Sequence, residues 1–164
     1  MINDIILMVI GFLGIVVGVI IGQHTYEELK PGEKYFILFK NMVLIFLAMV
    51  LLFSIKRLEI DYIFLLLLGF LIAHFLKYTY FFIGLSAVVS IMIGNQLLIL
   101  PLIYIYGMPF GTIRYYHIKN RRRLIKILLI NFIIFMLPLA LLYFDFNVYA
   151  LTAFSAGALI ANVR

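Results

Sequence analysis

The chain has 164 residues, of which 66% are hydrophobic and only 12% are charged, with a formal net charge of +6. This composition lies outside the range of soluble globular domains and predicts an all-α integral membrane protein. One span takes about 20 apolar residues, so we expect six transmembrane helices and little else. The sequence has no cysteine, which leaves no disulfide framework, thiolate nucleophile or sulfur metal site.

The sequence contains six apolar stretches, at 5–22, 35–55, 62–76, 80–106, 124–144 and 148–163. Asp4, and no basic residue, precedes the first stretch, so we expect a retained helix and not a signal peptide. The stretch at 80–106 contains Asn95, Gln96 and Pro101, and forms either one kinked helix or a span followed by a re-entrant piece.

Two pairs of segments resemble one another. Residues 13–23 match 85–95, and residues 69–74 match 157–162, with small residues opposite small residues. These matches predict an internal duplication, with residues 1–78 as the first three-helix unit and 79–164 as the second. An odd number of spans per unit makes this an inverted 3+3 repeat. The alternative is a chance similarity between apolar segments.

The loop from Arg114 to Lys126 has no acidic residue. Its basic residues are Arg114, Lys119, Arg121, Arg122, Arg123 and Lys126. The positive-inside rule therefore predicts that this loop is cytoplasmic in a plasma or inner cell membrane. Counting spans then places both termini in the cytoplasm and segment 24–34 outside.

The arginines of this loop also have a predicted role in lipid contact. We expect Arg121, Arg122 and Arg123 to determine topology and to attract anionic membrane lipids. The loop is too short for a nucleic-acid-binding module, so nucleic acid is not an expected partner. The turn at Lys56 and Arg57 is expected on the same side of the membrane.

Small residues recur at intervals of four in both units, as Gly14, Gly18 and Gly22 and again as Ser86, Ser90 and Gly94. Such faces allow helix backbones to approach closely in lipid, so we expect the first and fourth stretches to cross along this seam. The seam is either a packing contact alone or a mobile septum around a site. Uncharged polar residues near it, Ser86, Ser90, Asn95 and Gln96, are the predicted substrate pathway.

The sequence offers little for catalysis. It has no HExxH or GxSxG motif and no pair of aspartates inside the stretches, so we expect no enzyme activity, metal or cofactor. Two functional hypotheses follow. The first is a carrier or channel-like permease for a small solute, and the alternative is a non-catalytic structural or assembly subunit of a larger membrane complex. A homodimer is also compatible with the exposed small-residue faces.

Overall fold

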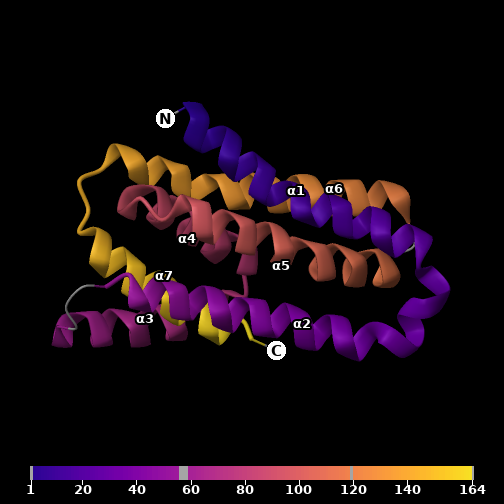
Figure 1. Ribbon diagram of the computed structural model, residues 1–164, viewed down its shortest axis with the longest axis horizontal. Coiled ribbons are helices and arrows are strands. Elements are labelled where there is room, and N and C mark those ends of the chain that lie inside the picture. The colour runs from indigo at the N-terminus through magenta and orange to yellow at the C-terminus, as the bar shows by residue number, and fades with distance from the viewer. Residues whose placement is uncertain (1, 56–58, 119, 164) are drawn as a thin grey trace.

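The computed structural model describes residues 2–55, 59–118 and 120–163. The predicted turn at Lys56 and Arg57 lies outside the described residues, as do Lys119 and Arg164. The described residues form seven α-helices and one 3₁₀ helix, which confirms the all-α class (Figure 1). They are α1 (Ile2–His24), α2 (Tyr26–Phe53), α3 (Ile60–Leu76), α4 (Thr79–Ile93), α5 (Gln96–His117), α6 (Arg121–Met136), η1 (Leu137–Tyr143) and α7 (Val148–Ala161).

Four helical segments are long and apolar enough to cross a membrane, namely Asn3–His24, Tyr26–Phe53, Gln96–His117 and Arg121–Tyr143. The apolar helices α3, α4 and α7 have 17, 15 and 14 residues. At 1.5 Å per residue they are about 21–26 Å long, which is less than the roughly 30 Å of bilayer hydrocarbon. The described residues thus include four helical segments that are long enough to span the membrane, and the six predicted spans are not shown.

The apolar stretch at 80–106 contains a sharp turn. Helix α4 ends at Ile93, and Gly94 follows in the left-handed conformation with φ of 84°. Glycine adopts this conformation without the steric cost that a side chain imposes. The Asn95 side chain anchors the turn because its Nδ2 donates to Ser54 Oγ at the end of α2, at 2.9 Å. The stretch at 80–106 is therefore not one kinked helix, because it contains α4 and the first part of α5, which pack against each other.

Helix α1 packs most extensively against α5. Gly11 lies beside Leu100, and further along both helices Gly18 lies against Met108. Contacts that advance together along two helices show that α1 and α5 run parallel. These two helices are parallel because the turn at Gly94 adds one reversal of chain direction between α1 and α5.

Helices α3 and α7 form a second extensive contact and also run parallel (Figure 1). Near their starts, Tyr62 clusters with Ala153. Just beyond their ends, Thr79 Oγ1 donates to Asn162 Oδ1 at 2.6 Å.

The parallel direction of α3 and α7 differs from what the predicted inverted repeat requires. The matched segments 69–74 and 157–162 lie in α3 and α7, and an inverted repeat would make them antiparallel. The structure does not show this inverted relation, because α4 adds a helix that the six-span prediction did not count. Each of the two extensive helix contacts instead joins one helix from residues 1–78 to one from residues 79–164.

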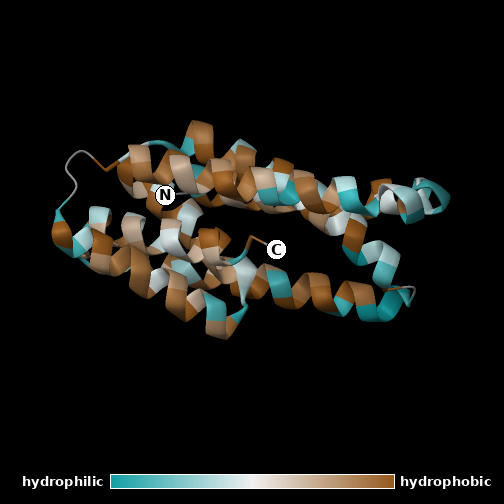
Figure 2. Cartoon of the chain, turned by 90° about the horizontal axis from the view of Figure 1, so that it is seen from below, coloured by the Kyte–Doolittle hydropathy of each residue, from teal (hydrophilic) through white to brown (hydrophobic). Residues whose placement is uncertain are grey.

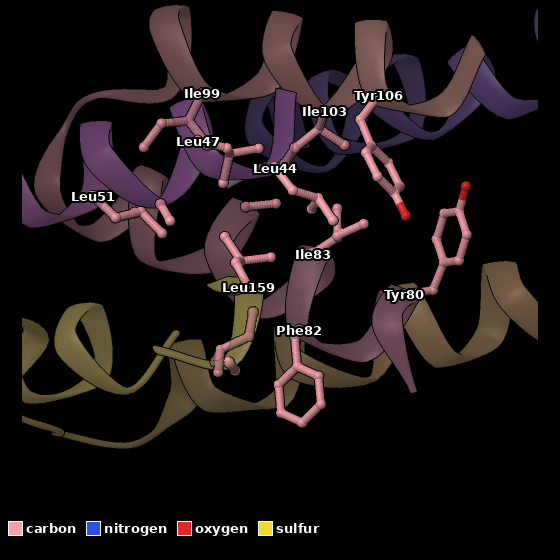
Figure 3. Close-up of a cluster of buried hydrophobic side chains, with 14 of the residues drawn as sticks. Leu44, Leu47, Leu51, Tyr80, Phe82, Ile83, Ile99, Ile103, Tyr106 and Leu159 are labelled. Atoms are coloured by element: carbon pink, nitrogen blue, oxygen red, sulfur yellow. The ribbon is translucent and has the colours of Figure 1, made fainter. Parts of the chain in front are cut away.

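The apolar core surrounds α4, which is buried continuously from Phe82 to Ser90. Side chains from α2, α5 and α7 close over it, as Leu44, Ile103 and Leu159 illustrate (Figure 3). The outer faces remain largely hydrophobic, and hydrophilic residues gather most densely at one end of the molecule (Figure 2). This distribution suits a helical bundle that lipid surrounds.

Candidate functional site

The two serines of the predicted substrate pathway lie in the packed core. Ser86 and Ser90 have no exposed surface. Ser86 Oγ donates to Ile83 O at 2.7 Å, and Ser90 Oγ donates to Ala87 O at 2.6 Å. Because each hydroxyl is bonded to its own helix, neither donor is available to a passing solute in this conformation.

The two amides of the predicted pathway lie at the turn that follows α4. Asn95 is bonded to Ser54, as described above. The Oε1 of Gln96 is buried and has no hydrogen-bond partner among the described residues. Gln96 lines an otherwise apolar groove of about 290 Å³ between α1 and α5, beside Gly11 and Tyr104. Gln96 thus combines a buried polar atom without a partner and a position on the wall of a groove.

The predicted glycine seam joins α1 to α5. A Cβ added at Gly14 or Gly18 would fall on the backbone carbonyl of Tyr104 or Met108, respectively. Gly22 approaches α5 less closely, with Thr112 O at 3.1 Å from such a Cβ.

The other face of the seam also differs from the prediction. Gly107 and Gly111 of α5 pack back against the α1 backbone, and Ser86 and Ser90 do not take part in that contact. The spacing also predicts that Gly94 belongs to the seam. In the structure Gly94 forms the turn between α4 and α5, and a Cβ there would meet no atom within 4 Å.

A hydrogen bond that was not predicted from the sequence joins α5 to α1 beside these glycines. Thr112 Oγ1 lies 2.9 Å from Gly18 O on α1 and 2.9 Å from Met108 O on its own helix. Thr112 is fully buried. The signal in the sequence is its position directly after Gly111, where a hydroxyl lies on the small-residue face of α5.

Segment 24–34, which contains Glu27, Glu28 and Glu33, lies at the same end of the molecule as the basic loop from Arg114 to Lys126. The Glu33 carboxylate and the His117 imidazole are 2.8 Å apart (Oε1 to Nε2). The ring of Tyr26 lies 6.4 Å from that of Tyr115 and 5.7 Å from that of Tyr116, centroid to centroid. The prediction that segment 24–34 and the loop from Arg114 to Lys126 face opposite sides is therefore wrong.

The same geometry corrects the predicted position of the N-terminus. Helix α1 runs from the N-terminus to His24, so the N-terminus lies at the end opposite the basic loop (Figure 1). Counting spans failed because the turn at Gly94 adds one reversal between the first helix and that loop.

Basic side chains at this end flank the last turns of α5. The guanidinium carbon of Arg114 lies 5.0 Å from the centre of the Phe110 ring, in cation–π geometry. Arg114 also lines a pocket of about 190 Å³ together with Lys40 and His117. A second groove, of about 310 Å³, lies between α1 and α6 and also contacts α5.

Helix α6 begins at this second groove. Its N-cap is Asn120, whose Oδ1 accepts from the backbone nitrogens of Arg122 and Arg123 at 3.0 and 3.3 Å. Arg121, Arg122 and Arg123 are all exposed, and Arg121 is the one of the three that lines the groove.

Within the described residues, no group of three or more histidine or acidic side chains is placed to hold a metal ion. The chain matches no protein-family model, and no match was found among curated proteins or solved structures. Its helices have the length and composition of a multi-pass membrane protein. A more specific function has to be argued from the chain's own residues.

Proposed function

We propose that the protein is a non-catalytic subunit or assembly partner of other components in the plasma or inner cell membrane. The observation that carries this proposal is the backbone contact between α1 and α5 at Gly14 and Gly18. Close glycine contacts of this kind hold transmembrane helices together by packing. A carrier that rocks about this seam would have to open it.

Hydrogen bonds between helices support a fixed bundle. Thr112 bonds to the carbonyl of Gly18 on α1, and Thr79 bonds to Asn162 beyond the end of α7. Hydrogen bonds between membrane helices contribute about 0.6 kcal/mol on average. Together with the packed serines of α4, these contacts favour a rigid binding partner over an alternating carrier.

The orientation in the membrane is part of the same proposal. The end that carries Arg121, Arg122 and Arg123 faces the cytoplasm, in keeping with the positive-inside rule. Segment 24–34 lies with it, and the N-terminus faces the opposite side.

The experiment that tests the rigid bundle uses the absence of natural cysteine. Ser86→Cys and Ser90→Cys change the side chain least within the core, and Glu28→Cys provides an exposed control. We expect the two core variants to resist membrane-permeant thiol reagents while the control reacts. Rapid labelling of the core variants would mean that water reaches α4, which contradicts a packed, static bundle.

A permease for a small solute is the second candidate, and Gln96 is the observation that favours it. A buried amide oxygen without a partner costs about 1–3 kcal/mol, and a rotation of the Gln96 side chain would present that oxygen to a hydrogen-bond donor in the adjoining groove. Gln96→Cys distinguishes the two candidates. Labelling that changes from one side of the membrane to the other with conditions supports a permease, whereas labelling from one side or neither supports the static subunit.

A further inference from the structure

The groove between α1 and α6 has polar residues at one end. Gln23 of α1, Tyr115 of α5 and Arg121 of α6 line this part, which we call the mouth of the groove. None of the described residues that line the groove is acidic. The mouth thus combines one permanent cation with two side chains that donate hydrogen bonds.

The rest of the groove is apolar and lies deeper in the bundle. Its walls include Val19 of α1 and Leu124 and Leu128 of α6. Helix α1 runs towards the basic end, so Val19 is one turn deeper than Gln23. Helix α6 runs away from that end, so Leu128 is about 10 Å deeper than Arg121 at 1.5 Å per residue. Both helices therefore change from polar to apolar in the same direction.

We propose that this groove binds an anionic glycerophospholipid from the membrane leaflet at the basic end. The lipid phosphate lies at the mouth against Arg121, whose planar guanidinium suits two phosphate oxygens. An acyl chain lies along Val19, Leu124 and Leu128. The groove volume of about 310 Å³ falls within the usual size of a small-molecule site, about 300–1,000 Å³.

Charge favours this occupant over a zwitterionic lipid. Arg122 and Arg123 are exposed beside the mouth and add attraction for an anionic surface without lining the groove. The proposal concerns these lining residues and holds whether the protein is a subunit or a permease.

The adjacent arginines provide a matched test. Purified wild-type protein, Arg121→Gln and Arg122→Gln are each mixed with phosphatidylglycerol or phosphatidylcholine in detergent, and bound lipid is counted by native mass spectrometry. We expect the wild type to retain phosphatidylglycerol preferentially. Arg121→Gln should lower that retention about ten-fold, as expected for the loss of a hydrogen bond between charged groups, and Arg122→Gln less than about two-fold, because Arg122 does not line the groove. Equal losses in the two variants would indicate diffuse attraction and overturn the site.

A second pair of variants tests the acyl chain without changing charge. Leu128→Trp fills the deep part of the groove, and Leu129→Trp places the same side chain at an exposed neighbouring position that does not line it. We expect the first to reduce phosphatidylglycerol retention and the second to leave it unchanged. Unchanged retention in both variants would mean that no chain occupies the groove.

Competition separates the lipid from a soluble anion. Glycerol phosphate carries the headgroup chemistry without acyl chains, so millimolar amounts should leave phosphatidylglycerol bound. Displacement by glycerol phosphate as effective as by added lipid would show a site for a free phosphate ester and would contradict the lipid assignment. All variants are compared at matched helical content and melting temperature, so that unfolding is not counted as lost binding.

Discussion

Gly18 shows at the residue scale how strictly the seam limits side-chain size. A methyl group there would overlap the Met108 carbonyl, whereas a Cβ at Gly32 in α2 would meet only the Phe36 ring at 3.8 Å. We expect Gly18→Ala to lower the free energy of unfolding by about 1–3 kcal/mol, the usual range for overpacking. Gly32→Ala should raise it by about 0.5–1 kcal/mol because alanine restricts the unfolded chain.

Thermal unfolding of both variants in one detergent measures this difference. Similar stability of Gly18→Ala and wild type would show that α1 and α5 are not in backbone contact.

Tyr80 is a buried polar residue whose replacement we expect not to destabilise the protein. Its hydroxyl is buried without a hydrogen-bond partner among the described residues, and its side chain projects towards that of Tyr106 (Figure 3). Tyr80→Phe removes a donor that is not in use, so we expect unchanged or higher thermal stability. A loss of more than about 1 kcal/mol would mean that the hydroxyl has a partner in the folded protein.

Thr112 provides the comparison with a hydrogen bond that is formed. Thr112→Val keeps the shape of the side chain but removes its bond to the Gly18 carbonyl. We expect a loss of about 0.6 kcal/mol, and at most about 1.7 kcal/mol, in the free energy of unfolding. Equal melting temperatures for Thr112→Val and wild type, measured in the same detergent, would contradict a stabilising contact.

The sequence predicts residue types at the site better than their contacts. Gly14 and Gly18, which the spacing singles out, lie against the α5 backbone, but the partner helix is not predictable from that spacing. The serines of α4 carry the same spacing, yet they bond to their own backbone. Side-chain hydrogen bonding within one helix competes with any functional use, and periodicity alone does not distinguish the two.

At the element scale, Gly94 separates α4 from α5. A Cβ there would meet no atom within 4 Å, so only the backbone conformation, with φ of 84°, opposes a side chain. We expect Gly94→Ala to cost about 1–2 kcal/mol in the free energy of unfolding, the price of left-handed geometry for an L-residue. Gly94→Asn should cost less, because asparagine tolerates this conformation. Equal losses for the two variants in thermal unfolding would contradict a left-handed turn.

Element boundaries were predictable only in part. The apolar stretch at 5–22 falls within the helical segment Asn3–His24, and the stretch at 124–144 ends one residue beyond the segment Arg121–Tyr143. In the stretch at 80–106, Asn95 and Gln96 indicate a possible break, but they do not show that the chain reverses its direction there, and one glycine is a weak signal among small residues. The predicted loop from Arg114 to Lys126 begins inside α5, which stays helical to His117.

At the scale of the whole molecule, membrane class was predictable from composition, but orientation was not. The positive-inside rule identifies the basic loop from Arg114 to Lys126 as one end of the protein. The predicted orientation of every other segment depended on how often the chain reverses direction. One additional turn, at Gly94, therefore inverts the predicted orientation of each helix that precedes it. The short loops hold too few charges to reveal the error.

The contact between Glu33 and His117 makes the resulting arrangement testable, because it requires segment 24–34 and the basic loop to share one side of the membrane. The cysteine-free chain allows single probes at Glu28→Cys, Arg122→Cys and, in the loop before α7 at the opposite end, Asp145→Cys. Each probe is treated with an impermeant thiol reagent in intact cells and in inverted membrane vesicles. We expect Glu28→Cys and Arg122→Cys to react only in inverted vesicles and Asp145→Cys only in intact cells. Reaction of Glu28→Cys and Arg122→Cys from opposite sides would contradict the fold described here.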